Sequence, residues 1–174
     1  MPEHRPGTPA AFIMLESFLW WDFQDAADWR KWARRWGLAR SSSAALPAYD
    51  LALAAQRALR QLEAVNNGAR PDRKAVEALN RLIGELEIRP EVSPSGSIAL
   101  SSGGRSAARP VAALLVLALE AMTAGLWHRF KLCRDPACSA SFYDASKSGT
   151  KIWCSMAVCG SRNKMRRLRQ RRKS

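Results

Sequence analysis

Apolar residues near the start of the chain recur with the period of an α-helix. In the apolar stretch of residues 12–21, four side chains share one helical face: Phe12, Leu15, Leu19 and Trp20. A short apolar stretch is also compatible with a buried strand, because the period alone does not separate the two over so few residues. We predict a helix here and keep a strand as the alternative.

A second amphipathic segment follows between Asp25 and Gly37. Three tryptophans fall on one helical face at spacings of three and four residues: Trp29, Trp32 and Trp36. We interpret this stripe as core-facing rather than as an aromatic cage for a ligand. The side chain of Asp25 or Asp28 can cap the helix N-terminus, and Gly37 can adopt the left-handed conformation that ends a helix.

The remaining upstream segments predict two more helices, a hairpin and a central helix. One helix is expected over about residues 47–66 and the next with Pro71 in its first turn, and their short connection makes them antiparallel neighbours. The apolar period then falls to two around residues 85–101, which predicts a β-hairpin. Residues 111–130 are strongly apolar, so they predict the central helix of the body, leading directly into Cys133.

Composition predicts a packed, intracellular protein. The apolar fraction of 47% over 174 residues is enough for one core, with room for a small appendage. The longest apolar run, residues 111–119, is too short to cross a bilayer, and the N-terminus shows no signal-peptide pattern. We therefore expect a cytoplasmic protein without a membrane partner, in a compartment that keeps cysteine thiols reduced.

All four cysteines lie in the last quarter of the chain, in two pairs with identical spacing. Cys133 and Cys138 are separated by four residues, as are Cys154 and Cys159, and fifteen residues lie between the pairs. Four thiolates fill the tetrahedral shell that Zn²⁺ prefers, which predicts one structural zinc ion. Two disulfides, or four unrelated core cysteines, are the alternatives. A catalytic zinc would need an open coordination position and a nearby general base, and the sequence has no such motif.

We predict a treble-clef-like finger around this zinc, in which a knuckle, a hairpin and a basic helix follow one another. Residues 141–144 and 151–153 flank a turn rich in Ser, Lys and Gly, which predicts the hairpin. The second cysteine pair is expected in the first turns of the terminal helix. About forty residues cannot bury enough apolar surface alone, so zinc would complete a small core. Its expected members are Phe142, Trp153, Met156, Met165 and Leu168.

Positive charge is concentrated in the same quarter, because residues 133–174 carry +9 of the net +13. A cationic end points to a polyanion, most directly nucleic acid, although a merely solubilising tail is the alternative. The candidate nucleic-acid-binding residues are Lys147, Lys151, Arg162, Asn163, Lys164, Arg166, Arg167, Arg169, Arg171 and Arg172. Arg162 and Asn163 are chemically suited to base edges, but a structural role, such as an Arg162–Asp144 ion pair, is equally open.

Three motifs of this quarter closely resemble the CGNR zinc finger family. They are Cys133-Arg-Asp-Pro-Ala-Cys138, Ser141-Phe-Tyr-Asp-Ala-Ser146 and Trp153-Cys-Ser-Met-Ala-Val-Cys-Gly-Ser-Arg-Asn-Lys164. Ser161 departs from the name-giving motif, because the family has Asn there, whereas Gly160 and Arg162 match. Upstream, the order of helices, hairpin and long helix is similar to the ABATE domain. The resemblance implies a bacterial regulator of stress-related transcription that binds DNA.

Together these observations predict a mainly α protein with a small β-hairpin. We expect a disordered tail over residues 1–10, a helical ABATE-like domain over residues 11–130, and the zinc finger with its basic helix over residues 131–174. The predicted function is zinc-dependent DNA binding in transcription regulation at the nucleoid, with the helical domain as sensor or dimerisation unit and a homodimer left open. RNA binding, and docking of an acidic protein partner, are the alternatives. No catalytic triad, glycine-rich phosphate loop or carboxylate pair stands out, so we expect no enzyme.

Overall fold

Six α-helices form most of the regular secondary structure in the computed structural model, which describes residues 7–38, 48–103 and 106–172. They are α1 (Ile13–Trp20), α2 (Ala26–Arg35), α3 (Tyr49–Asn66), α4 (Arg73–Glu85), α5 (Arg109–Thr123) and α6 (Ser161–Arg171). Two antiparallel hairpins complete the described fold: β1 (Ile88–Val92) with β2 (Ile98–Ser102), and β3 (Phe130–Leu132) with β4 (Ser141–Tyr143). The predicted fold class, mainly helical with small hairpins, is confirmed.

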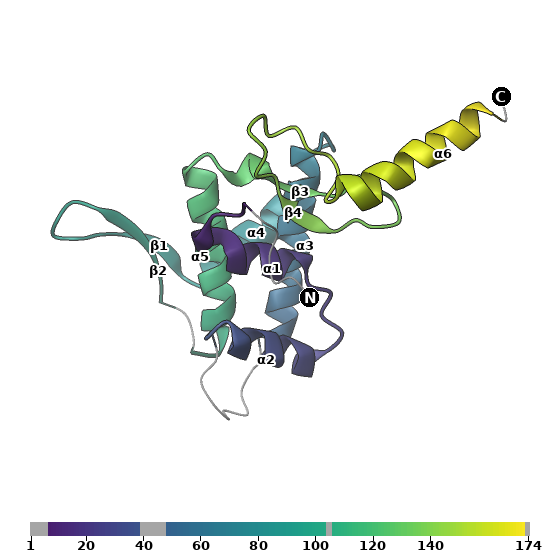
Figure 1. The fold of residues 1–174 in the computed structure, drawn as a ribbon. Coiled ribbons are helices and arrows are strands. Elements are labelled where there is room, and N and C mark those ends of the chain that lie inside the picture. The colour runs from purple at the N-terminus through teal and green to yellow at the C-terminus, as the bar shows by residue number, and fades with distance from the viewer. Residues whose placement is uncertain (1–6, 39–47, 104–105, 173–174) are drawn as a thin grey trace.

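The helical body is built on α3 and α5, and α1 packs against both of them (Figure 1). α4 lies along α3, to which it is joined by a short connection, as the sequence predicts for antiparallel neighbours. Two elements leave the body on opposite sides: the β1–β2 hairpin on one side and α6 on the other (Figure 1). The basic helix therefore stands clear of the body over most of its length.

The core is aromatic where α1 meets α2. The ring of Phe18 lies 6.1 Å from that of Trp29 and 5.7 Å from that of Trp32, and the two indoles stack at 5.5 Å. All three side chains are buried. Such aromatic pairs contribute about 0.5–1.5 kcal/mol beyond the area that they bury. The core-facing tryptophan stripe is confirmed, and the first apolar segment is a helix rather than a strand.

The boundaries of α2 follow the predicted signals. The carboxylate of Asp25 accepts hydrogen bonds from the N–H groups of Ala27 and Asp28, each at 2.8 Å. Gly37 follows the helix with a φ of 68°, a conformation that a side chain would strain. Both the cap and the stop are therefore local properties of this stretch of sequence.

The central helix is shorter than predicted. α5 ends at Thr123, and Gly125 follows with a φ of 68°, the left-handed conformation that closes a helix. The chain then makes a short 3-10 turn (Trp127–Arg129) and enters β3 at Phe130. The prediction of a rigid helix leading directly into Cys133 is wrong, because Gly125 stops the helix and Phe130 turns into the core.

The β3–β4 hairpin docks on the body through both apolar and polar contacts. Phe130 is fully buried, with its ring 5.9 Å from that of Phe12 and 5.2 Å from that of Tyr143. The N–H of Tyr143 donates to Glu16 at 3.0 Å, and Nδ2 of Asn66 donates to the carbonyl of Phe130 at 2.8 Å. Side chains of α1 and α3 thus form hydrogen bonds with backbone groups of this hairpin. The division into two domains at residue 130 stays a prediction.

Two predicted segments fall partly outside the described residues. The helix expected over residues 47–66 is observed as α3, and Pro47 lies outside the described part of the chain. Of the tail expected over residues 1–10, residues 1–6 also lie outside it, whereas Thr8 is buried and its hydroxyl donates to Glu16 at 2.6 Å. Among the described residues, no helix combines the length and apolarity needed to cross a bilayer.

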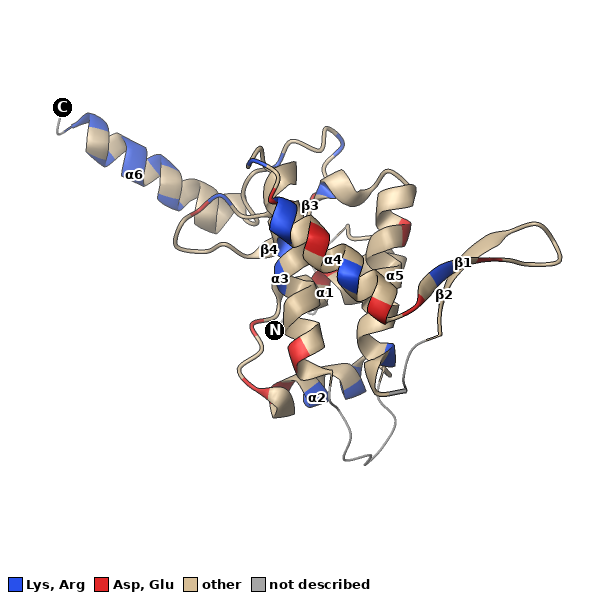
Figure 2. Cartoon of the chain, turned by 180° about the vertical axis from the view of Figure 1, so that it is seen from behind, with Lys and Arg blue, Asp and Glu red and all other residues tan. Residues whose placement is uncertain are grey.

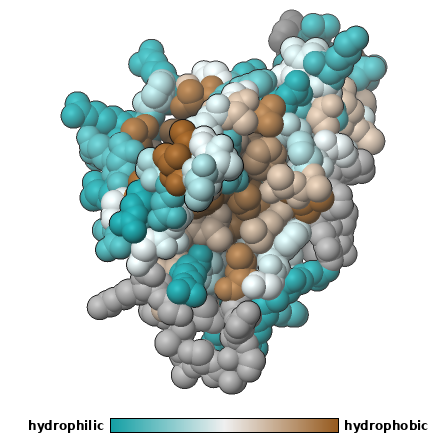
Figure 3. All heavy atoms as spheres, turned by 90° about the vertical axis from the view of Figure 1, so that its left-hand side faces the viewer, coloured by the Kyte–Doolittle hydropathy of each residue, from teal (hydrophilic) through white to brown (hydrophobic). Residues whose placement is uncertain are grey.

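The β1–β2 hairpin presents apolar side chains to solvent. Val92 and Ile98 pair across the two strands, and each is 72% exposed. On this side of the molecule, apolar side chains also gather in a hollow that polar residues surround (Figure 3). A surface of this kind is typical of protein–protein contact.

Glu63 of α3 is fully buried beneath the finger. Its Oε1 accepts a hydrogen bond from the hydroxyl of Ser141, whereas Oε2 has no hydrogen-bond partner within the described residues. Burial raises the pKa of Glu63 from 4.5 to about 8, against the opposing effects of the Ser141 hydrogen bond and the charge of Arg60. The carboxyl group is therefore protonated in the folded protein at neutral pH.

We expect Glu63 to make the folded state less stable as the pH rises. Between its ordinary pKa of 4.5 and its folded pKa of about 8, the folded state holds one proton more than the unfolded state. Raising the pH across this window therefore favours unfolding, by up to about 1.4 kcal/mol per pH unit. Glu63→Gln removes this proton, so its free energy of unfolding, measured by urea titration, should decline less with pH than that of the wild type.

Glu77→Gln, which changes an exposed carboxylate on α4, is the matched control and should follow the wild-type curve. Parallel pH curves for wild type and Glu63→Gln would show that Glu63 is ionised in the folded protein.

Candidate metal centre

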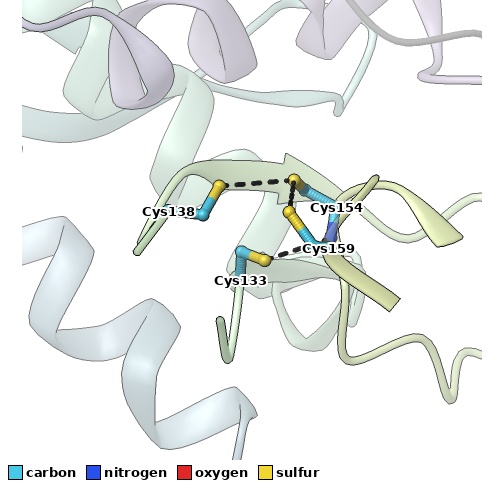
Figure 4. Close-up of side chains that lie close together, drawn as sticks. All are labelled: Cys133, Cys138, Cys154 and Cys159. Carbon is cyan, nitrogen blue, oxygen red and sulfur yellow. Dashed lines mark hydrogen bonds between the residues drawn. The ribbon is translucent and has the colours of Figure 1, made fainter. Parts of the chain in front are cut away.

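The four cysteines converge on one point in the described structure (Figure 4). All four Sγ atoms lie within 4.8 Å of one another, and Sγ of Cys154 lies 3.6 Å from those of Cys138 and Cys159. Four sulfurs bound to one Zn²⁺ at about 2.3 Å stand about 3.8 Å apart, so the observed spacing suits a tetrahedral site. The four thiols form a site that could hold one zinc ion, as predicted.

Two tight backbone turns bring the cysteines together. The first pair flanks a knuckle directly after β3, in which Cys138 N–H donates to the carbonyl of Asp135 at 2.8 Å and Cys133 N–H to that of Ala140 at 2.8 Å. In the second pair, Cys154 precedes a π-helical turn (Met156–Gly160) and Cys159 lies within it, and the hydroxyl of Ser155 accepts from the N–H of Val158 at 3.3 Å. Both turns point their thiols inward because the backbone bonds hold each loop closed.

Charge explains why this arrangement needs a cation. Burial raises the pKa of the Cys133 and Cys159 thiols, because thiolates lose solvation there. Four converging thiolates also repel one another, and a divalent ion offsets both effects. An all-sulfur donor set favours zinc over magnesium or calcium, which prefer oxygen.

Asp135, inside the first knuckle, braces the terminal helix against the metal site. Its carboxylate is fully buried and accepts from Nη1 of Arg162 at 2.6 Å, from Nη2 of Arg166 at 3.5 Å and from the N–H of Ala137 at 3.3 Å. Burial alone would raise the pKa of Asp135, but the Ala137 hydrogen bond and the Arg162 charge outweigh it and lower the pKa. Two of the candidate nucleic-acid-binding arginines, Arg162 and Arg166, therefore bind a carboxylate of the finger itself.

Asp144 has a different partner from the one predicted. Arg162 pairs with Asp135, and Asp144 instead receives Nζ of Lys131 at 2.9 Å, with both members of that pair buried. Asp144 also accepts hydrogen bonds from Ser146 and from the N–H of Lys151. Burial opposes ionisation, but these donors lower the pKa of Asp144 to about 2. The Arg162–Asp144 pair is thus a wrong prediction, because β3 brings Lys131 to Asp144.

The prediction that residues 151–153 form the partner strand of residues 141–144 is wrong. β4 pairs with β3 of residues 130–132, and residues 151–153 form no strand. The loop that follows β4 is satisfied by side chains instead, because Asp144 binds its N–H groups and Lys131 donates to the carbonyls of Gly149 and Lys151. A pairing strand is therefore not required to order residues 144–151.

The terminal helix does not have the predicted inward stripe. Met165 is 49% exposed and Leu168 42% exposed, because α6 extends away from the helical body, which therefore does not cover them (Figure 1). Met156 is also exposed, so the small core consists of the cysteines with Phe142 and part of Trp153. The second cysteine pair precedes α6 rather than lying in its first turns, which also differs from the prediction.

Asn163 is the remaining candidate that the fold uses for itself. It is buried, its Nδ2 donates to the carbonyl of Cys159 at 2.8 Å, and its Oδ1 accepts from Arg166 at 2.8 Å. A base-reading role for Asn163 would require these bonds to break. The other candidates are exposed, and those on α6 lie along a helix without acidic residues (Figure 2): Lys147, Lys151, Lys164, Arg167, Arg169, Arg171 and Arg172.

Within the described part of the finger, sequence reasoning missed two buried charged residues, Lys131 and Asp135. Each is separated from its partner by more than ten positions, 13 for Lys131 with Asp144 and 27 for Asp135 with Arg162. No local period marks such pairs. The sequence marks these two residues only by their position, because each lies within two residues of Cys133.

Residues 129–172 match the family model described as CGNR zinc finger. No curated protein matches the chain. The resemblance predicted for the last quarter is confirmed, whereas the similarity of the upstream residues to the ABATE domain stays a prediction. Where the family has Asn, the hydroxyl of Ser161 donates to the carbonyl of Met156 at 3.3 Å and so ties α6 to the preceding π-helical turn.

We expect Asp135→Asn to weaken zinc retention. The variant keeps an oxygen acceptor for Ala137 but loses the charge that holds Arg162 and Arg166. Residues that orient metal ligands contribute about 10–100-fold to metal affinity, so the zinc dissociation constant, measured by competition with a chelator, should rise by this factor.

Asp50→Asn, which changes an exposed carboxylate in the first turn of α3, is the control and should leave zinc affinity unchanged. An Asp135→Asn protein with wild-type zinc affinity would mean that the Arg162–Asp135 pair is not needed for the metal site.

Proposed function

Because residues 129–172 carry a CGNR zinc finger, we propose that the chain is a zinc-dependent DNA-binding regulator of transcription. One observation carries this proposal: α6 is a cationic helix without acidic residues that extends from a metal-braced base into solvent (Figure 2). Its 11 residues span about 16 Å along the helix axis. An α-helix is narrow enough to fit into the major groove of B-DNA. The arginines on its free surface can reach phosphates on either side of such a groove.

The candidate nucleic-acid-binding residues fall into two groups, which supports phosphate contact rather than base reading. Contacts inside the finger hold Arg162, Arg166 and Asn163, so these residues orient α6. The exposed cations beyond them have long, flexible side chains that suit phosphate oxygens. Affinity for DNA should therefore be high at low salt and depend little on sequence.

The helical body serves in this proposal as a sensor or dimerisation unit. The apolar side chains on the β1–β2 face support self-association, since exposed apolar patches favour protein contact. A stress-related role rests on the family resemblance alone. RNA is the alternative polyanion, because the same cations would contact its phosphates, and competition between duplex DNA and structured RNA distinguishes the two.

Duplex binding should weaken steeply with salt. If about four to six cations contact phosphates, log K falls against log[salt] with a slope of about −4 to −5. Arg167→Gln/Arg171→Gln removes two exposed cations without touching the Asp135 contacts. It should weaken binding of a labelled duplex and make the slope shallower by about 1.8, as measured by fluorescence anisotropy.

Lys74→Gln/Arg81→Gln removes two exposed cations from α4 and is the matched control. The proposal fails if low-salt binding is absent, or if both double variants change the slope equally.

A second candidate function is docking of an acidic protein partner. Four apolar side chains on and before α6 are exposed: Met156, Val158, Met165 and Leu168. Met165 and Leu168 line a groove of about 390 Å³ together with Trp153, Lys164 and Arg167. An amphipathic helix with acidic flanks would match this surface in both shape and charge.

Replacing the apolar residues separates the two candidates. Met165→Ser/Leu168→Ser should leave duplex binding within about twofold of wild type, because neither side chain contacts phosphate in the DNA proposal. A helical probe peptide with leucines at i and i+4 between glutamates reports on the alternative. Peptide binding that is lost in this variant, in a protein that binds no duplex at low salt, would favour the adaptor.

A further inference from the structure

A second pocket lies between the helical body and the zinc knuckle. Its volume is about 700 Å³, within the range of small-molecule sites in proteins. The C-terminal end of α1, the exposed side of α3 and the knuckle residues 138–140 form its walls. Of the four cysteines, only Cys138 lines this pocket, and the proposed DNA contact uses none of its lining residues.

Two tryptophans form an aromatic wall. Trp20 and Trp21 are half-buried, and their rings meet nearly at a right angle, 86°, with centroids 6.3 Å apart. Trp21 is fixed in place, because its Nε1 donates to Asp28 at 2.9 Å and its carbonyl accepts from Gln56 at 2.7 Å. Both indoles line the pocket and are only partly covered, so they offer aromatic surface that suits a planar aromatic ring.

Two arginines of α3 supply positive charge to the same pocket. Arg57 and Arg60 stand three residues apart, so they lie on one face of the helix. Arg60 is held in place, because it donates to the carbonyl of Leu19 at 2.7 Å and to that of Ser139 at 2.7 Å. Arg57 is exposed and makes no hydrogen bond or ion pair with any described residue. Its guanidinium is therefore free to exchange water for an anionic group.

Two carboxylates also line the pocket, so its formal charges balance. Asp22 lies between α1 and α2, and Asp28 lies in the first turn of α2, where it accepts hydrogen bonds from the indole of Trp21 and the N–H of Gln24. Both arginines stand on α3, so the part of the pocket that α3 lines is the cationic part. An anionic group on a ligand is attracted to that part.

The knuckle wall is strained in the way common at ligand sites. Ser139 has a φ of 47°, which is unusual for a residue other than glycine. Its carbonyl accepts from Arg60, and its N–H donates to the carbonyl of Asp135 at 3.2 Å. The pocket thus joins α3 to the residue that follows the metal ligand Cys138.

We propose that this pocket binds a small planar aromatic anion, with its ring against Trp20 and Trp21 and its anionic group between Arg57 and Arg60. The site goes beyond the proposed function, because binding of this ligand needs no nucleic acid. An aromatic carboxylate and a nucleotide share this chemistry, and the two are separated by the probes used.

Calorimetric titration of the full-length, zinc-loaded chain tests the proposal. The probes are 2-naphthoate, its uncharged amide, cyclohexanecarboxylate and adenosine monophosphate. An aromatic anion should bind at one site per chain, and the amide and cyclohexanecarboxylate at least tenfold more weakly. Tighter binding of adenosine monophosphate than of 2-naphthoate would assign the natural ligand to the nucleotides, and the reverse order to the aromatic carboxylates.

Variants locate the site. Arg57→Gln and Trp20→Ala should each weaken binding of the tighter aromatic anion at least tenfold, whereas Trp20→Phe retains an aromatic face and should lose less. Arg81→Gln, the same change at an exposed position on α4, is the control. Zinc content and far-UV circular dichroism of each variant verify its fold. If Trp20→Ala is not folded, binding of the aromatic anion to Arg57→Gln and Trp20→Phe decides whether the ligand occupies this pocket.

Two results would overturn the proposal: neither aromatic anion binds, or binding is unchanged in both Arg57→Gln and Trp20→Ala. The second result would place the ligand elsewhere, such as the cationic groove beside Trp153. Arg57→Gln should retain wild-type duplex binding, so failure of this site and failure of DNA binding are seen in separate measurements.

Discussion

Four sulfur atoms within 4.8 Å of one another impose the central constraint on the C-terminal quarter of this protein. Buried thiolates repel each other and lose solvation, so they converge only around a cation. The two turns that present them contain little apolar material, because only Phe142 and part of Trp153 pack against the cysteines. The two cysteine turns and the base of α6 therefore depend on the metal site more than on hydrophobic packing, whereas β3 and β4 are also held by Phe130 and Tyr143 in the main core.

Ion pairs made by two buried carboxylates extend that constraint to the rest of the finger. Asp135 binds Arg162 and so orients α6, while Asp144 binds Lys131 and orders the loop after β4. Each carboxylate is fully buried, so removing a partner would leave a costly uncompensated charge. The cations of this quarter thus fall into two groups: those that build the finger, and those on the free surface of α6 that remain available to a polyanion.

The finger is also anchored in the helical body. Phe130 enters the core, Glu16 and Asn66 bind backbone groups of the hairpin, and Arg60 links α1 to the knuckle through two carbonyls. A change at the proposed aromatic-anion pocket would therefore act on Arg60, and through Ser139 on the loop that carries Cys138. This physical connection is what a sensor domain would need to influence the finger.

The sequence by itself determined the features that depend on neighbouring residues: the tryptophan face of α2, its Asp25 cap, its Gly37 stop and the four-cysteine set. The three features of α2 are each encoded within a few positions, where period and backbone preference act directly, and the cysteine set is recognised by the identical spacing of its two pairs. Only the tertiary structure decided that β4 pairs with β3, that Arg162 binds Asp135, and that Met165 and Leu168 face solvent. These outcomes depend on which distant segments meet. A helical period shows that a face is apolar, but not whether the fold supplies a surface to cover it.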